Sequence, residues 1–286
     1  MNKNKLKLKL VIGSANFTQK YGVDSIKINH KENKKILDLA KKNHIFRIDT
    51  AEAYLQNKNN FKNIDKKFKF FTKVIPDSKW ASLDFCQKKL EDHFNNFARN
   101  KVEALLFHDI EILLTKNGKK IFKNLEILKK KKYFNKIGIS IYDTNCLNNL
   151  ISNYNFDIVQ CPYNILDRRI LTSGWFDKLK SKGVEVHVRS IFLQGLLVNN
   201  SIYRKSYFKK WNFFFVEWFK ALEKNNISPI DYCFSDLLNY DFDKIIIGIN
   251  DSKNLKEIIN FKSINKNKMI NFKISDKRLI DPRNWK

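Results

Sequence analysis

Four polar side chains stand at or just after the ends of apolar runs, where packing alone does not call for them. Asp49, Tyr54, Lys73 and His108 supply a carboxylate, a phenol, an ammonium and an imidazole. A phenol is a weak acid with an ordinary pKa near 10, and a neighbouring ammonium lowers that pKa by favouring the phenolate. The set suits protonation of a carbonyl oxygen while hydride reaches its carbon. We therefore predict Tyr54 as general acid, Lys73 as its activator, Asp49 as the anchor of Lys73, and His108 as a hydrogen-bonding guide for the oxygen.

Each of these residues also has an ordinary structural explanation when taken alone. Asp49 followed by Thr50 could cap a helix, and a single lysine or histidine at the end of a strand is common. The four together at matching positions favour a shared site, provided that the fold brings those positions together.

Short apolar runs typical of strands alternate with longer amphipathic stretches typical of helices. The expected strands are Leu8–Gly13, Phe46–Asp49, Phe68–Lys73, Val102–His108, Lys136–Ser140, Ile158–Cys161, Glu185–Arg189 and Lys244–Ile249. The expected helices are Lys31–Lys42, Leu83–Phe97, Lys119–Lys132, Thr144–Ser152 and Phe176–Lys182. Ser228 followed by Pro229 predicts the start of another helix, which runs to Leu238, and Tyr207–Lys224 reads as a helical insertion after the seventh strand.

Eight buried strands separated by helices predict an α/β fold with a parallel sheet that is covered on its faces. In a chain of 286 residues, eight such units favour a closed (β/α)8 TIM barrel. No linker rich in Gly, Ser or Pro marks a boundary, so we expect a single domain over residues 1–286. The carboxyl ends of barrel strands meet on one face, which is where Asp49, Lys73 and His108 would converge with Tyr54.

The formal net charge of +26 raises the question of a polyanionic partner. The lysines are spread from Lys3 to Lys286 beside many Asn, Ile and Phe, all of which have A/T-rich codons, so genome composition explains the excess. No nucleic-acid motif accompanies the charge, and we expect no specific nucleic-acid partner. A basic polyanion binder stays as an alternative, tested by salt-sensitive retention on nucleic acid.

The apolar and cysteine content bears on the compartment. No run reaches the roughly 18 apolar residues of a membrane helix, and the most apolar one, Phe213–Val216, is followed at once by Glu217. The apolar start of the chain is too short for a signal peptide, so we expect a cytoplasmic protein without a membrane partner. Four widely spaced cysteines without a CxxC pair predict buried thiols and no metal site.

The first expected strand is followed by Gly13-Ser14-Ala15-Asn16, which is not the glycine-rich fingerprint of a Rossmann fold. A dinucleotide, if bound, is held in another way.

The chain resembles the aldo/keto reductase family. Ile48-Asp49-Thr50-Ala51-Glu52-Ala53-Tyr54 resembles the signature that carries the family's catalytic Asp and Tyr, while Phe71-Thr72-Lys73 and Leu106-Phe107-His108 match its Lys and His motifs. The resemblance runs from about Leu10 to Phe261. The further matching segments, in family order, are Ile137–Ser140, Val159–Asn164, Gln194–Leu197, Ile246–Gly248 and Asn254–Glu257.

The resemblance implies a (β/α)8 barrel that binds NADP(H) extended across its mouth. It places Ser140 and Gln160 at the nicotinamide carboxamide, and Ser190 at the pyrophosphate. It places Gly248, Ser252, Asn254 and Glu257 around the adenosine. Ser252 and Lys253 would meet a 2′-phosphate, so NADPH is expected over NADH. Gly248 could instead permit a tight turn, and Ser252 could only cap the last helix.

Three departures from the family's pattern concern the coenzyme contacts. Ser140-Ile141 and Glu257-Ile258 stand where Ser-Asn and Glu-Asn are frequent, and Arg189 replaces the aromatic residue that often stacks on the nicotinamide. We expect Arg189 to stack on the nicotinamide or to contact phosphate. The alternative is a salt bridge to Glu185 or Asp167.

The resemblance implies an NADPH-dependent oxidoreductase that reduces an aldehyde or ketone. The stretches 164–169 and 189–195 resemble relatives among bacterial surface-polysaccharide and nucleotide-sugar enzymes, so a sugar-like small carbonyl substrate is expected. A catalytically weak, cofactor-binding regulatory subunit on the same fold is the alternative, and the oligomeric state is left open.

Overall fold

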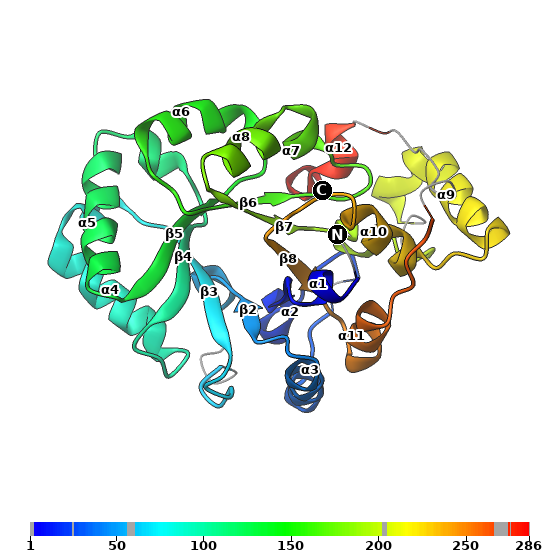
Figure 1. The fold of residues 1–286 in the computed structure, drawn as a ribbon, viewed down its shortest axis with the longest axis horizontal. Coiled ribbons are helices and arrows are strands. Elements are labelled where there is room, and N and C mark those ends of the chain that lie inside the picture. Colours follow the sequence, from blue (N-terminus) through cyan, green and yellow to red (C-terminus); the bar gives the residue numbers. More distant parts are fainter. Residues whose placement is uncertain are drawn as a thin grey trace.

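Eight parallel strands close into a barrel in the computed structural model, which describes residues 3–24, 26–55, 61–201, 205–265, 274 and 276–285 (Figure 1). Neighbours in the barrel are neighbours in the chain, and β1 pairs with β8 to complete the circle. The predicted barrel is confirmed, and each predicted strand is present with ends shifted by at most two residues. The strands are β1 (Leu10–Gly13), β2 (Arg47–Asp49), β3 (Lys69–Val74), β4 (Val102–Phe107), β5 (Phe134–Ser140), β6 (Ile158–Pro162), β7 (Glu185–Arg189) and β8 (Lys244–Gly248).

Side chains that alternate along each strand build layers inside the barrel. One buried layer is apolar and consists of Val11, Phe71, Ala104, Leu106, Ile158 and Ile246. The β5 strand comes very close to β6, because a Cβ placed on Gly138 would lie 2.7 Å from the carbonyl oxygen of Ile158. The next inward positions toward the carboxyl ends belong to Asp49, Lys73, Ser140 and Gln160, which are all buried. The polar site therefore rests on a packed apolar floor.

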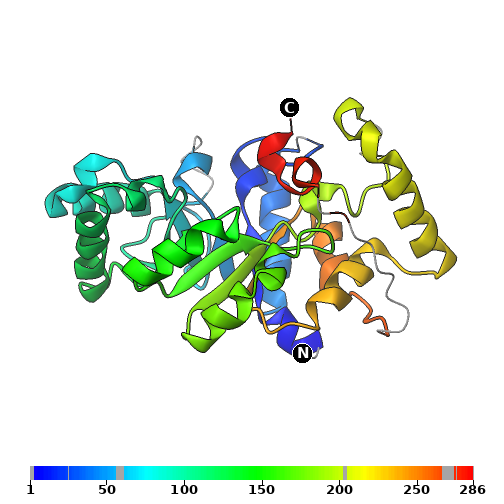
Figure 2. The same ribbon diagram turned by 90° about the horizontal axis from the view of Figure 1, so that it is seen from above.

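Helices cover the outside of the barrel and connect its strands (Figures 1 and 2). The connecting helices agree with the predicted stretches, except that Thr144–Ser152 is divided into a 3-10 turn, η5 (Thr144–Cys146), followed by α6. The α-helices are α1 (Lys3–Lys7), α2 (Ala15–Thr18), α3 (His30–Lys42), α4 (Leu83–Asn95), α5 (Gly118–Lys130), α6 (Leu147–Asn153), α7 (Arg169–Thr172), α8 (Trp175–Ser181), α9 (Asn212–Lys224), α10 (Pro229–Leu237), α11 (Ser252–Ile259) and α12 (Lys277–Ile280).

The helix ends follow local sequence signals. The Ser228 side chain accepts a hydrogen bond from the Asp231 amide, so the predicted cap of α10 is present. The predicted insertion after β7 forms the 3-10 helix η8 (Ser206–Trp211) and then α9, which stands at the edge of the molecule in both views (Figures 1 and 2). Within the described residues, no helix has the length and apolar character that crossing a membrane requires.

Candidate active site

Lys73 and Asp49 form a buried ion pair at the carboxyl ends of β3 and β2. The ammonium Nζ of Lys73 donates to Asp49 Oδ1 at 2.5 Å and to the carbonyl oxygen of Thr50 at 3.3 Å. The second carboxylate oxygen of Asp49 accepts from Gln160 Nε2 at 2.8 Å. Burial lowers the pKa of Lys73, and the attraction of Asp49 opposes that change. The ammonium of Lys73 can be buried because Asp49 neutralises its charge and two oxygens accept its hydrogen bonds.

Tyr54 reaches the same place from a short turn after β2. The 3-10 helix η1 (Glu52–Tyr54) is closed by a hydrogen bond from the Tyr54 amide to the Ala51 carbonyl oxygen at 2.9 Å. The phenol ring packs edge-on against the imidazole of His108, with centroids 5.9 Å apart and an interplanar angle of 84°. Asp49, Tyr54, Lys73 and His108 all line one cavity of about 160 Å³ at the mouth of the barrel. The structure therefore brings the four predicted residues together.

The pKa of Tyr54 moves in the opposite direction to the sequence-based expectation. Burial, which withdraws the phenolate from water, raises the pKa of Tyr54, and the neighbouring Tyr21 and Asp49 add to the rise. The charge of Arg189 opposes the rise without cancelling it. Tyr54 is therefore a neutral phenol, and the expected lowering of its pKa was wrong because the sequence does not show how deeply the ring is buried.

His108 is a neutral imidazole at physiological pH. Burial, with the Lys73 charge second, lowers the pKa of His108 to about 4. Its Nδ1 atom is buried without a hydrogen-bond partner among the described residues. A neutral ring has one N–H donor and one acceptor, so His108 can donate a hydrogen bond to an oxygen in the cavity.

Ser140 and Gln160 lie side by side at the ends of β5 and β6, where they are register partners. Both line the cavity, and Gln160 is completely buried. Its amide nitrogen is bonded to Asp49, but its Oε1 atom has no partner among the described residues. A buried acceptor left unpaired is costly, and a primary carboxamide entering the cavity would supply the missing N–H donor.

The segment after β7 forms the wall of the cavity with an unusual backbone. Ser190, Leu193 and Gln194 have positive φ angles of 62°, 46° and 53°, which non-glycine residues rarely adopt. Asn164 holds the segment by donating from Nδ2 to the carbonyl oxygen of Ser190 at 3.2 Å. Ser190 lines the cavity as expected, in a backbone conformation of the kind that turns peptide N–H groups toward one concave side.

Arg189 faces the cavity and stacks on an aromatic ring of the protein itself. Its guanidinium carbon lies 4.2 Å from the ring centroid of Tyr142, and its Nη2 donates to the Ile141 carbonyl oxygen at 3.1 Å. Arg283 lies at the same distance of 4.2 Å over the same ring. One face of a ring has no room for both groups, so the two guanidiniums take opposite faces.

The alternative salt bridge for Arg189 was wrong, because both expected partners are engaged elsewhere. Glu185 accepts from Lys136 and pairs with His187, and Asp167 pairs with Arg169.

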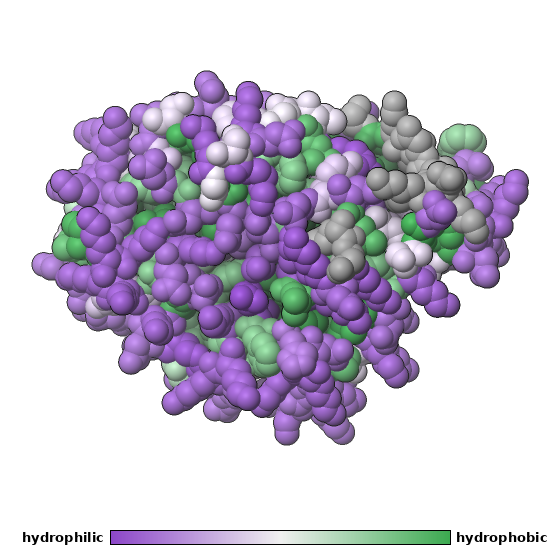
Figure 3. Space-filling view, viewed as in Figure 1, coloured by the Kyte–Doolittle hydropathy of each residue, from purple (hydrophilic) through white to green (hydrophobic). Residues whose placement is uncertain are grey.

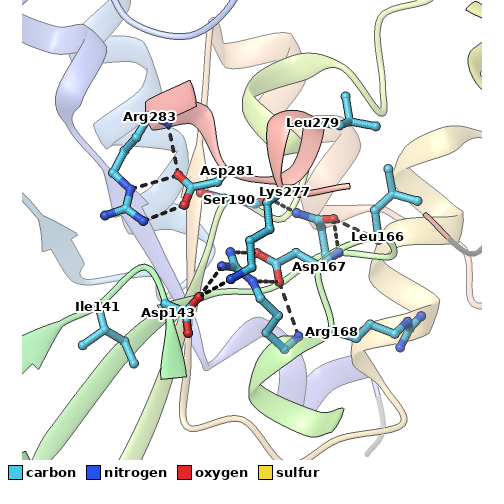
Figure 4. A network of polar contacts seen from close by, with 12 residues as sticks. Ile141, Asp143, Leu166, Asp167, Arg168, Ser190, Lys277, Leu279, Asp281 and Arg283 are labelled. Carbon is cyan, nitrogen blue, oxygen red and sulfur yellow. Dashed lines mark hydrogen bonds and ion pairs between the residues drawn. The ribbon is translucent and has the colours of Figure 1, made fainter. Parts of the chain in front are cut away.

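A network of charges attaches the end of the described chain to this side of the barrel mouth (Figure 4). Asp143 lies 3.1 Å from Lys277 of α12 and 3.4 Å from Arg169 of α7. Arg169 also makes two hydrogen bonds to Asp167, at 2.7 and 2.8 Å. The segment that holds α12 thus lies beside the cavity that Tyr142 lines.

Sequence reasoning missed three aromatic residues of the cavity, Tyr21, Tyr142 and Phe192. Tyr21 lies in the loop after β1, where an antiparallel bridge to Ile26 shapes the chain. Tyr142 follows Ser140-Ile141 by one residue. Its position just after a strand end was the available signal.

The adenosine end predicted from the resemblance is only partly assembled. Gly248 and Asn254 line the cavity, whereas Ser252 and Glu257 are not among its lining residues, and Glu257 is exposed on α11. Gly248 has open space around its missing Cβ and no positive φ angle, which argues against a tight-turn role.

Ser252, which was predicted beside the adenosine, has its amide and its hydroxyl bonded within the protein. Its amide and its hydroxyl both donate to Glu32 Oε1, at 2.8 and 2.6 Å. The cap of α11 is Asp251, which accepts from the Asn254 amide at 2.7 Å, so Ser252 is not the cap either.

Comparison with known proteins agrees with this geometry. The model of the aldo/keto reductase family matches residues 9–273, and the chain belongs to that family. An aldo-keto reductase from Bacillus halodurans in its holo form has a TM-score of 0.69 at 17% identity, with 94% of this chain and 95% of that chain covered. A glycerol dehydrogenase from Gluconobacter oxydans has a TM-score of 0.68 at 15% identity, with 91% and 88% covered. No match is found among the curated proteins.

Family membership defines the chain as an oxidoreductase that acts on small carbonyl compounds with a nicotinamide coenzyme.

Proposed function

We propose that the chain reduces an aldehyde or a ketone to an alcohol, with Tyr54 as the proton donor. The observation that carries this proposal is the buried Lys73–Asp49 ion pair, 2.5 Å between Nζ and Oδ1, at the base of a cavity that Tyr54 and His108 also line. A protein that only needs a stable barrel gains nothing from placing these charges inside it, because buried charges are costly. The pair is accounted for by chemistry that takes place above it.

The carbonyl oxygen binds between the phenol of Tyr54 and the imidazole of His108. The neutral His108 donates an N–H to that oxygen and orients it, and the edge-on contact of the two rings fixes the angle between the donors. The coenzyme, when bound, supplies hydride to the carbonyl carbon. As negative charge develops on the oxygen, Tyr54 releases its proton to it.

The raised pKa of Tyr54 supports this timing. An alkoxide is a strong base, so a phenol can protonate it even when burial has raised the pKa of the phenol. A phenol whose pKa is raised by burial keeps its proton until the oxygen has become a strong base. Lys73 lines the same cavity as Tyr54 and would supply a positive charge for the phenolate left behind, and Asp49 keeps the ammonium oriented.

The residues of the cavity fit a nicotinamide. The unpaired Oε1 of Gln160 and the hydroxyl of Ser140 would hold the carboxamide, which has both donors and an acceptor. Arg189 would lie against the ring, and Ser190 with the backbone after it would hold the pyrophosphate. Gly248 and Asn254 would extend the site toward the adenosine.

NADPH is the form of the coenzyme that the resemblance implies. Lys253 is exposed in the first turn of α11 and remains available to a 2′-phosphate. The amide and the hydroxyl of Ser252 already donate to Glu32, so of the two predicted phosphate partners only Lys253 is left.

A sugar-like carbonyl compound fits the polar character of the mouth. Tyr21, Tyr142 and Arg189 line the cavity and present hydroxyl and guanidinium groups to a substrate with several oxygens.

Tyr54→Phe tests the proposal. The variant keeps the ring packed against His108 and loses only the donor, so we expect turnover to fall by roughly two to four orders of magnitude with the dissociation constant of the coenzyme unchanged. The measurement is oxidation of the reduced coenzyme on a panel of aldehydes, ketones and sugars, with coenzyme affinity from fluorescence titration. Near wild-type turnover in the variant would refute the role of Tyr54. Tight coenzyme binding without turnover of any carbonyl by the wild-type protein would favour the regulatory subunit.

A further inference from the structure

A carboxylate from a distant part of the chain occupies the first turn of α11. Glu32 belongs to α3, which packs beside α11 (Figure 1), and its Oε1 atom accepts from both the amide and the hydroxyl of Ser252. Its other oxygen lies 3.1 Å from Lys35 Nζ, one turn further along α3. The two hydrogen bonds from Ser252, followed by those of Lys35, lower the pKa of Glu32 to about 2. Glu32 is therefore a fixed negative charge at neutral pH.

The cavity of Tyr54 extends to this same helix. Its lining residues include Tyr54 and Gln160 at one end and Gly248, Asn250 and Asn254 at the other. Asn250 and Asn254 flank Ser252 in the sequence, and all three belong to the segment between β8 and the first turn of α11. A dinucleotide whose nicotinamide lies at Gln160 would therefore bring its adenosine ribose to the part of α11 that Glu32 touches.

Glu32 and a 2′-phosphate would compete for the same donors. A phosphate at the start of a helix normally accepts from free amides and hydroxyls of the first turn. Here the amide and the hydroxyl of Ser252 are already bonded to a carboxylate, so a phosphate would have to displace Glu32 and then remain beside a like charge. Asn250, also in this segment, is uncharged and adds no compensation.

A ribose 2′-hydroxyl, unlike a phosphate, can bind to a carboxylate. It donates a hydrogen bond, and a carboxylate is a strong acceptor that remains with free lone pairs after two hydrogen bonds. Lys35 is paired with Glu32 itself. Lys253 can reach a phosphate, but it is exposed, and an ion pair in water is weaker than the two hydrogen bonds that Ser252 would have given.

We propose that Glu32 selects the coenzyme that lacks the 2′-phosphate, so that the chain uses NAD(H) in preference to NADP(H). This inference rests on the proposed function and replaces the expectation of NADPH. Glu32 acts as a specificity residue from outside the barrel, 220 positions away from the serine that it holds.

The test is the pair of dissociation constants for NADH and NADPH, measured by fluorescence titration without substrate. For the wild-type protein we expect NADH to bind at least tenfold more tightly. In Glu32→Ala the charge is gone and Ser252 is free, so NADPH should bind about tenfold more tightly than before, while NADH binding stays the same or weakens. Glu32→Gln keeps an acceptor for Ser252 without the charge, and its preference should lie between the two.

Asp38→Ala is the matched control, because Asp38 is an exposed carboxylate on the same helix. It should leave the ratio of the two constants unchanged. A wild-type preference for NADPH, or the same ratio in Glu32→Ala as in the wild type, would overturn the inference while leaving the proposed function intact. Failure of both dinucleotides to bind would instead overturn the proposed function together with the inference.

Discussion

Inside the barrel, the ammonium of Lys73 is hydrogen-bonded to Asp49 Oδ1 and to the carbonyl oxygen of Thr50 instead of to water. Its side chain is 3% exposed and that of Asp49 is 7% exposed. If one charge is removed, water therefore cannot solvate the other. The Gln160 amide is the remaining partner of Asp49, and it is neutral.

Lys73→Met should therefore affect folding as well as catalysis. The change leaves Asp49 buried without its counter-charge, and losing one partner of a buried pair costs about 3–5 kcal/mol. The measurement is the free energy of unfolding from urea titration. Lys69→Met on the same strand is the control, because Lys69 is 58% exposed and pairs with Glu103 at 3.5 Å, so it should cost less than about 1 kcal/mol. The double variant Lys73→Met with Asp49→Asn should recover part of the loss. If Lys73→Met is no less stable than Lys69→Met, the charge of Asp49 is compensated in some other way.

At the scale of elements, α12 depends on the barrel mouth through charged side chains. Asp143 is the common partner of Lys277 and Arg169, and it also caps the turn η5 by accepting from the Asn145 amide. The apolar contribution of α12 comes from Leu279 and Ile280, which are buried.

Asp143→Ala should loosen the segment from 277 to 285 without unfolding the barrel. The change removes the ion pair to Lys277 and frees Arg169, so local opening becomes easier. We expect amide hydrogen exchange of this segment to rise about tenfold, while exchange in β3 to β6 stays as in the wild type. Asp84→Ala, which removes an exposed carboxylate at the start of α4, serves as the control. Unchanged exchange in Asp143→Ala would mean that the apolar contacts of Leu279 and Ile280 hold α12 by themselves.

The elements that could be predicted from the sequence are those with a strong pattern. The strands are nearly continuous apolar runs, and their carboxyl ends alone predict that Asp49, Lys73 and His108 lie on one face. The short helices α7 and α12 have only four residues each, too few for a helical period to show.

The contact of Glu32 with Ser252 could not be predicted, because it joins residues 220 positions apart. The pKa of Tyr54 depends on burial, which is likewise a property of the folded chain.

At the scale of the whole molecule, buried histidines couple the fold to pH. Burial lowers the pKa of His93 and of His108 to about 4, and it also lowers the pKa of His187. In the unfolded chain each histidine takes up a proton near its ordinary pKa of about 6.5. The unfolded state therefore binds more protons than the folded state between these values, and stability falls as the pH falls from about 6.5 to about 4.

Urea midpoints measured at pH 7, 6 and 5 should decrease steadily. His93 and His108 each contribute a slope of at most about 1.4 kcal/mol per pH unit within that window, and His93→Gln should reduce the slope by one such contribution. The carboxylates with lowered pKa, such as Glu32, add their loss only below about pH 4.5, so the two effects separate. A flat profile from pH 7 to 5 would show that the histidines are protonated in the folded state as well.

The face of the molecule in Figure 3 is dominated by hydrophilic side chains, with smaller apolar areas between them. The lysines that give the net charge of +26 are spread along the sequence from Lys3 to Lys286.

The apolar layer of Val11, Phe71, Ala104, Leu106, Ile158 and Ile246 lies across the interior of the barrel. It closes the floor of the cavity that Tyr54 lines, and the buried ring of His187 packs against Phe71 of this layer, with ring centroids 5.3 Å apart. In the proposed reaction, the substrate, the product alcohol and the proton that restores Tyr54 would all pass through the open mouth of the cavity. Because the cavity has this one opening among the described residues, substrate entry, product release and reprotonation would take place one after another.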